Sequence, residues 1–122
     1  MDYEAYLQAF NSAEDKEDLL RWYAPDVVIE GPAGVTPLDA FAEQLRNARD
    51  GVRVTAVPRI VLGDEGRLMA ELDITYAATR DRLDHPVVAL RADESATMRF
   101  FVVYELRDGR IVRFARAFWR VS

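Results

Sequence analysis

The chain has 122 residues, of which 50% are hydrophobic and 30% charged, with 6 glycines and 5 prolines, as expected for one folded domain over residues 1–122. It contains no cysteine, which excludes disulfides, thiolate metal sites and a cysteine nucleophile. The net charge of −5 and the scattering of its arginines among acidic residues argue against a nucleic-acid partner.

The first residues, Met1-Asp2-Tyr3-Glu4, are acidic where a secretory signal is basic. No apolar run approaches the roughly 18 residues that a membrane span needs. We therefore expect a protein that does not insert into a membrane and that resides in the cytoplasm.

The first part of the chain predicts two helices in succession. The first has an apolar stripe with i, i+3, i+4 and i+7 spacing, formed by Tyr3, Tyr6, Leu7 and Phe10. A capping-box-like sequence at 12–15 predicts the start of a second, short helix, and Ala24-Pro25 predicts its end. The apolar residues of this second helix are Leu19, Leu20, Trp22 and Tyr23.

A third helix is predicted after a short strand at 27–29. Thr36 is its expected N-cap and Pro37 occupies its expected first position. The helix carries Leu38, Phe41, Ala42 and Leu45 on one face, and Gly51 predicts its end.

From residue 52 the hydrophobic period changes to two, which predicts antiparallel strands at about 52–62, 67–78, 96–107 and 110–121. Asp108-Gly109, between the last two, is a strong signal for a tight hairpin. The segment 79–95 is predicted to form a long loop and is a candidate lid over a binding site. Helices followed by a run of strands predict the α+β class with segregated layers.

Alternate residues of a strand lie on opposite faces of the sheet, so strand phase predicts which side chains face the helices. In the strands at 67–78 and 96–107 the inward sets are Leu68, Ala70, Leu72, Ile74 and Tyr76, and then Met98, Phe100, Val102, Tyr104 and Leu106. The last strand divides into Val112, Phe114, Arg116 and Phe118 on one face and Arg113, Ala115, Ala117 and Trp119 on the other.

Several motifs occur in a recognisable order: Tyr23-Ala24-Pro25-Asp26 before a strand, Gly31-Pro32 with Gly34 beyond it, a capped helix, and a closing hairpin at 107–113. In this order and at this length they resemble the SnoaL-like domains of the superfamily that includes nuclear transport factor 2 and ketosteroid isomerase. The resemblance implies three N-terminal helices packed on a strongly curved, mainly antiparallel sheet, a cystatin-like cone with an internal cavity. It also implies that the Arg116 face of the last strand lines this cavity.

The sequence departs from the catalytic pattern of these relatives. Gly31 stands where ketosteroid isomerases have their catalytic aspartate, and their second acid aligns with the apolar Phe101 or Val102. The acid expected in the last strand of the cyclases is missing, and the paired aspartates of epoxide hydrolases have no counterpart there. The sequence contains no histidine–carboxylate cluster that could hold a metal, so no metal site is expected, and no cofactor is expected either.

Three residues are candidates for catalysis. An arginine on an apolar face needs a polar partner, so Arg116 either pairs with an internal acid, reaches the mouth of the cone, or clamps a ligand carboxylate or enolate. Tyr6 matches the family's oxyanion-stabilising tyrosine by resemblance if one extra residue is allowed between the first two helices, and the alternative is a core tyrosine with its hydroxyl at the rim. His85 is the only histidine and titrates near neutrality, either as a proton carrier or as a surface residue without function.

The expected ligand is a small hydrophobic or weakly acidic molecule, cyclic or polyketide-like. The residues predicted to contact it are Tyr6, Trp22, Tyr76, Phe100, Tyr104, Phe114, Arg116 and Phe118. The leading hypothesis is a small-molecule-binding domain with a hydrophobic cavity, which either only binds this molecule or transforms it as a cofactor-independent isomerase, cyclase or dehydratase. The alternatives are a noncatalytic ligand-binding or dimerisation module and a protein-interaction adaptor.

The outer face of the sheet is predicted to form a homodimer. Its apolar residues are Phe101, Val103, Ala115, Ala117, Trp119 and Val121, which is a large apolar patch to leave in water. Charged residues surround this patch and could set the pairing register: Glu71, Asp73, Arg99, Glu105 and Arg113.

Overall fold

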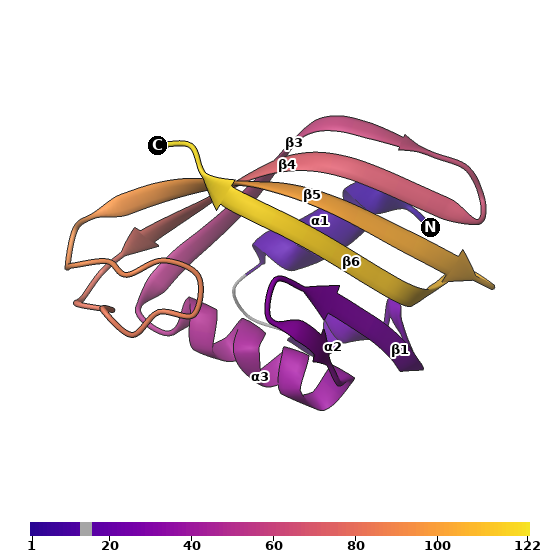
Figure 1. The fold of residues 1–122 in the computed structure, drawn as a ribbon, viewed down its shortest axis with the longest axis horizontal. Helices are drawn as coiled ribbons and strands as arrows, with labels where there is room; N and C mark the ends of the chain where they lie inside the picture. The colour runs from indigo at the N-terminus through magenta and orange to yellow at the C-terminus, as the bar shows by residue number, and fades with distance from the viewer. Residues whose placement is uncertain (13–15) are drawn as a thin grey trace.

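A computed structural model describes residues 1–12 and 16–122, which form three helices and six strands (Figure 1). The elements are α1 (Tyr3–Asn11), α2 (Lys16–Leu20), β1 (Tyr23–Gly31), β2 (Gly34–Thr36), α3 (Leu38–Arg49), β3 (Val52–Gly63), β4 (Arg67–Ala78), β5 (Ser95–Arg107) and β6 (Arg110–Arg120). The predicted α+β class is confirmed. Residues 13–15, most of the predicted capping box, lie outside the described part.

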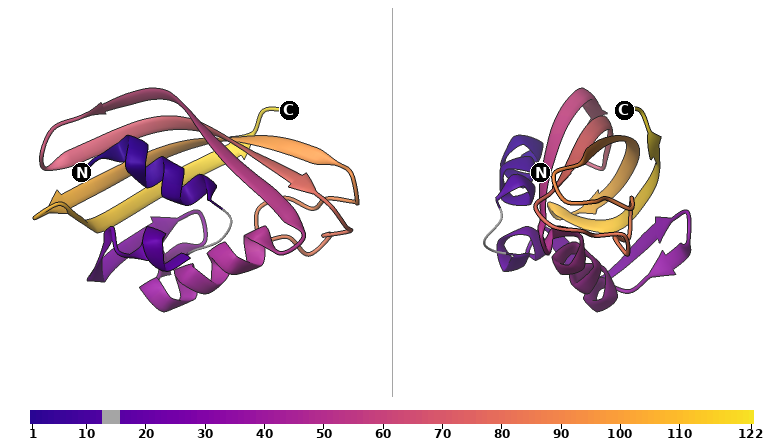
Figure 2. Two further views of the ribbon diagram at one scale, coloured as in Figure 1. Left: turned by 180° about the vertical axis from the view of Figure 1, so that it is seen from behind. Right: turned by 90° about the vertical axis from the view of Figure 1, so that its left-hand side faces the viewer.

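One mixed sheet runs in the order β2-β1-β6-β5-β4-β3. All neighbouring strands pair antiparallel except β1 and β6, which are parallel. The sheet bends strongly without closing, and the helices lie on its concave side (Figure 2). The segment between β4 and β5 passes across one end of this curved sheet (Figure 2).

The start of the first strand differs from the prediction. Tyr23 belongs to β1 rather than to a helix, because it pairs with Ile111 of β6 and the carbonyl of Trp22 accepts a hydrogen bond from the Ile111 amide. The helix α2 already ends at Leu20. The conformation of the chain at Tyr23 therefore depends on pairing with a parallel strand about 90 residues away, and no local sequence pattern indicates this pairing.

The start of α3 also differs from the prediction. Thr36 is the last residue of β2 and pairs with Ile29, so it cannot serve as the N-cap. Pro37 takes the cap position without a side-chain hydrogen bond, and the helix begins at Leu38. At the other end Gly51 has φ +69°, the left-handed conformation that glycine adopts without strain.

The strands from β3 onward lie close to their predicted bounds. The hairpin residues Asp108 and Gly109 have φ values of +53° and +78°, as a turn with two left-handed residues requires. A bulge between Glu105 and Leu106 shifts the register of β6. Ile111 consequently faces the core, with 0% exposure, instead of the predicted Val112.

The inner face of the sheet forms the core with the helices. The predicted inward sets of β4 and β5 are buried, apart from the half-buried Leu106. From α1, Tyr3, Tyr6 and Leu7 pack against them. None of the described helices is both long and apolar enough to cross a membrane.

The outer face of the sheet carries aromatic residues and paired charges. Phe101 and Trp119 are 47% and 45% exposed, and their rings meet edge to face at 4.9 Å. The loop between β4 and β5 therefore does not cover them. The charged residues of this face form ion pairs within the chain: Asp73–Arg99, Arg59–Glu71, Arg59–Asp73, Glu30–Arg113 and Glu105–Arg113.

Candidate functional site

A pocket of about 360 Å³ lies between the concave face of the sheet and the helices. This volume is near the lower end of the range for small-molecule sites, about 300–1,000 Å³. Side chains of α1, α3 and the four long strands form its walls, and the turn at 31–34 and residues 86–87 of the loop complete them. The lining is mainly aliphatic and aromatic.

Arg116 projects from β6 into this pocket. Its Nε is buried without a hydrogen-bond partner, and within residues 1–12 and 16–122 its guanidinium forms no ion pair. The Cζ atom lies 5.2 Å from the ring centre of Phe41 and 5.8 Å from that of Phe114. Burial lowers the pKa of Arg116, yet an arginine stays protonated. Pairing with an internal acid is thus not found in the described structure.

Gly31 leaves the space beside this guanidinium empty. A Cβ atom built on Gly31 would lie 3.4 Å from Nε of Arg116 and 3.7 Å from its Cγ. The backbone of Gly31 is outside the left-handed region, so other residues could adopt it. Gly31 therefore adjoins the Arg116 Nε atom, which has no hydrogen-bond partner among the described residues, and supplies no side chain that could pair with it.

Four buried tyrosines form a hydrogen-bonded cluster beside the pocket, and two of them, Tyr6 and Tyr104, line it. The hydroxyls of Tyr6 and Tyr23 are hydrogen-bonded at 2.5 Å, and those of Tyr3 and Tyr104 at 3.2 Å. Burial, as the largest cause, raises the pKa of all four phenols. They therefore stay protonated near neutrality and can donate hydrogen bonds to a negatively charged oxygen. Sequence reasoning missed Tyr23, because it placed this residue on a helix.

A second arginine lines the pocket from the last turn of α3. Arg49 donates from Nη2 to the carbonyl oxygen of Phe10, and its Cζ lies 4.9 Å from the Phe10 ring centre. Burial lowers the pKa of Arg49. Arg49 lies four residues after Leu45 and eight residues after Phe41, and both of these residues line the pocket. This helical spacing is the signal in the sequence that could have identified Arg49 as a pocket residue.

The pocket carries positive charge without an internal acid. Among the described residues that line it, none is Asp, Glu or His, whereas Arg49 and Arg116 are both present. Two guanidinium groups in a largely apolar cavity favour an anionic or strongly polar occupant. No group of three or more His, Cys, Asp or Glu residues in the described part of the chain is arranged to hold a metal ion.

Seven of the eight predicted ligand contacts line the pocket: Tyr6, Tyr76, Phe100, Tyr104, Phe114, Arg116 and Phe118. The eighth, Trp22, is outside the lining and lies behind Tyr6, with its ring edge to face at 6.3 Å. Its Nε1 atom is buried and has no hydrogen-bond partner in the described part of the chain. Trp22 therefore supports the position of Tyr6 rather than facing the pocket.

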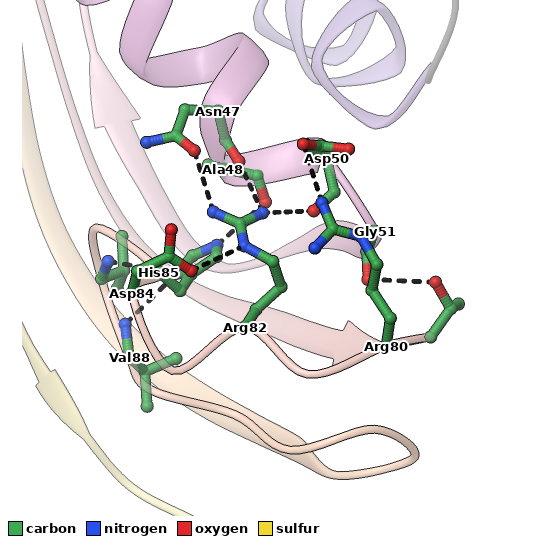
Figure 3. A network of polar contacts seen from close by, with 11 residues as sticks. Asn47, Ala48, Asp50, Gly51, Arg80, Arg82, Asp84, His85 and Val88 are labelled. Atoms are coloured by element: carbon green, nitrogen blue, oxygen red, sulfur yellow. Dashed lines mark hydrogen bonds and ion pairs between the residues drawn. The ribbon is translucent and has the colours of Figure 1, made fainter.

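His85 lies apart from the other two catalytic candidates. It is only 7% exposed, so the expectation of a surface histidine is wrong. Its Nε2 donates to the carbonyl of Ala48, and its Nδ1 accepts from the amides of Val87 and Val88 (Figure 3). This pattern needs the neutral ring, and burial lowers the pKa of His85 accordingly. Both nitrogens are occupied, and His85 is not among the residues that line the pocket.

Arg82 holds the loop against the C-terminal end of α3, as Figure 3 shows. Its side chain is 2% exposed and donates to the carbonyls of Asn47 and Asp50 and to Oδ1 of Asn47. Helix ends leave such carbonyls unsatisfied, so Arg82 acts as a C-terminal cap from another segment. Through these contacts the loop brings Pro86 and Val87 to the pocket wall.

The family model of the SnoaL-like domain matches residues 3–114. Among solved structures, the fold is similar to AclR of Streptomyces galilaeus, named as a candidate hydroxylase (TM-score 0.79, 11% identity, 95% of this chain and 75% of that one). It is also similar to IdmH of Streptomyces antibioticus, named as a candidate polyketide cyclase (TM-score 0.78, 17% identity, 95% and 88%). A SnoaL-like polyketide cyclase of Agrobacterium tumefaciens has a TM-score of 0.72 at 19% identity (96% and 87%). No curated protein sequence matches the chain.

Proposed function

Since this chain belongs to the SnoaL-like domain family, we propose that its pocket binds a small, mainly apolar ring molecule that carries one acidic or enolisable oxygen. The observation that carries this proposal is the half-buried Arg116, whose Nε atom is buried and has no hydrogen-bond partner among the described residues. Leaving a buried polar group unpaired costs about 1–3 kcal/mol, and more for a charged group. A ligand oxygen that pairs with Arg116 recovers this energy.

The rest of the pocket supports the same class of ligand. Phe41 and Phe114 flank the guanidinium and offer apolar surface to a ring system. The volume of about 360 Å³ suits a molecule of two or three fused rings. The names of the neighbouring cyclases by fold agree with a cyclic or polyketide-like compound.

Catalysis without a cofactor is the second candidate, and the paired phenols of Tyr6 and Tyr23 favour it. Donors placed beside Arg116 could stabilise the enolate oxygen of an isomerisation, cyclisation or dehydration. The described lining offers no carboxylate or imidazole as a general base. The enzyme would therefore act by stabilising negative charge on a substrate that enolises readily.

Calorimetry with two matched probes tests the binding proposal. We expect 2-naphthoate to bind more tightly than the neutral 2-naphthamide, and Arg116→Met to weaken the naphthoate by at least about 10-fold, because a charge-assisted bond contributes about 1.5–3 kcal/mol. The same substitution should weaken the binding of 2-naphthamide much less. Arg110→Met is the matched control, since Arg110 is an exposed residue of the same strand outside the pocket. Equal affinities of the folded Arg116→Met protein and the wild type for 2-naphthoate would contradict the proposal.

Proton exchange tests the catalytic candidate separately. The ketone 2-tetralone has two rings and acidic α protons, and NMR follows their replacement by deuterium in D₂O. If the site stabilises an enolate, the wild-type protein accelerates this exchange and Tyr6→Phe reduces the acceleration. An exchange rate equal to that of buffer would leave binding as the function.

A further inference from the structure

Arg49 of α3 and Arg116 of β6 reach the pocket at different positions along the axis of α3. The guanidinium of Arg116 lies against Phe41, in the first turn of α3. Arg49 comes eight residues later, so its backbone lies about 12 Å further along the helix axis. Between these levels the helix presents Leu45 and Ala48 to the pocket. The two positively charged side chains therefore enter one largely apolar pocket from separate positions.

The contacts inside the chain leave the charge of Arg49 without an acid. The carbonyls of Asn47 and Asp50, at the end of the same helix, accept hydrogen bonds from Arg82. Arg49 donates instead to the carbonyl of Phe10, which is a neutral partner. Within the described ranges no carboxylate lies at ion-pair distance from Arg49.

Tyr76 connects the two charges electrostatically. Burial raises the pKa of its phenol, whereas the positive charges of Arg116 and Arg49 lower this pKa. Its ring also lines the pocket. Both guanidinium groups therefore act on the same buried phenol, and the described lining offers neither of them a carboxylate. An occupant with a negative charge near each guanidinium supplies both missing partners.

We propose that the natural ligand carries two acidic groups at opposite ends of an apolar ring system, one held by Arg116 and the other by Arg49. This inference rests on the proposed function and adds the second anchor to it. Arg116 recognises the acidic oxygen close to the tyrosines, and Arg49 selects molecules that are long enough and acidic at the far end. A monoanion of the same size uses the first anchor only.

Calorimetry with 2,6-naphthalenedicarboxylate and the longer biphenyl-4,4′-dicarboxylate tests this inference against 2-naphthoate. At least one dicarboxylate should bind the wild-type protein 10-fold or more tightly than the monoacid. Arg49→Met should abolish this gain, so that the dicarboxylates bind this variant no more tightly than 2-naphthoate does. Arg46→Met is the matched control, because Arg46 lies in the same helical turn, outside the pocket, and pairs with Glu43.

A second variant separates the charge of Arg49 from its hydrogen bond to the Phe10 carbonyl. Arg49→Gln removes the charge but keeps an N–H donor for the Phe10 carbonyl, so it also serves if the methionine variant does not fold. A gain that persists in Arg49→Gln overturns the inference, as do two dicarboxylates that bind no more tightly than 2-naphthoate. If 2-naphthoate binding still depends on Arg116 in that case, the proposed function survives. If it does not, both fail.

Discussion

Gly31→Asp is the substitution that most directly tests the unpaired state of Arg116. A Cβ atom at position 31 lies 3.4 Å from Nε of Arg116, so a carboxylate one bond further reaches ion-pair distance without moving the backbone. The introduced acid gives the buried guanidinium a partner inside the protein. It therefore competes with any acidic ligand for the same charge.

The expected magnitudes follow from this geometry. A hydrogen bond to a charged group contributes about 1.5–3 kcal/mol, and burying the new carboxylate offsets part of this gain, which leaves about 1–2 kcal/mol of added stability. For a domain of this size that is a rise of roughly 3–10 °C in Tm. The affinity for 2-naphthoate should fall by at least about 10-fold, because the ligand must displace the internal carboxylate.

The stabilisation depends on pH in a definite direction. Arg116 lowers the pKa of the introduced carboxyl below its unfolded value of about 3.9, so the added stability is complete above that pH and is lost as the pH falls through the folded pKa. Thermal melts at pH 7 and pH 3 measure this difference. Gly31→Asn is the control of equal size without charge. A Gly31→Asp protein that melts no higher than Gly31→Asn at pH 7, with naphthoate binding intact, would refute the reasoning.

Three further predictions concern other parts of the molecule. Arg82→Met should lower the free energy of unfolding, measured by urea denaturation, by about 2–4 kcal/mol, because the carbonyls at the end of α3 lose their hydrogen-bond donor. An unchanged denaturation midpoint would mean that the loop does not cap the helix. Burial lowers the pKa of His85, so the stability that neutral His85 contributes is present above its unfolded pKa of about 6.5 and is lost as the pH falls further. Melting temperatures between pH 8 and 5 should show this decline, and His85→Gln should flatten it; identical profiles would contradict the assignment. The outer face of the sheet stays a predicted homodimer interface, so light scattering should report about twice the 13.9 kDa chain mass and Ala117→Arg should reduce it, whereas a wild-type monomer at every concentration would rule the dimer out.

Local chemistry in the sequence was sufficient for most of the sheet. Period-two alternation located β3 to β6, and Asp108-Gly109 located their last hairpin, because strand phase and turn conformation depend on neighbouring residues. The same alternation grouped Arg116 with Phe114 and Phe118, and the resemblance to the SnoaL-like domains implied that this face lines the cavity. The alternation failed at Ile111, where a bulge inserts one residue and reverses the phase.

The tertiary structure decided the partners of the polar groups, which no local pattern contains. Tyr23 meets Tyr6 because a parallel pairing with β6 draws residue 23 into a strand. Arg82 and His85 are buried because the loop folds onto the last turn of α3, where unsatisfied carbonyls accept their hydrogen bonds. The sequence alone determined that an arginine faces the pocket. Only the bending of the sheet around the helices determined that Gly31 leaves this arginine without a partner and that Arg49 enters the same space.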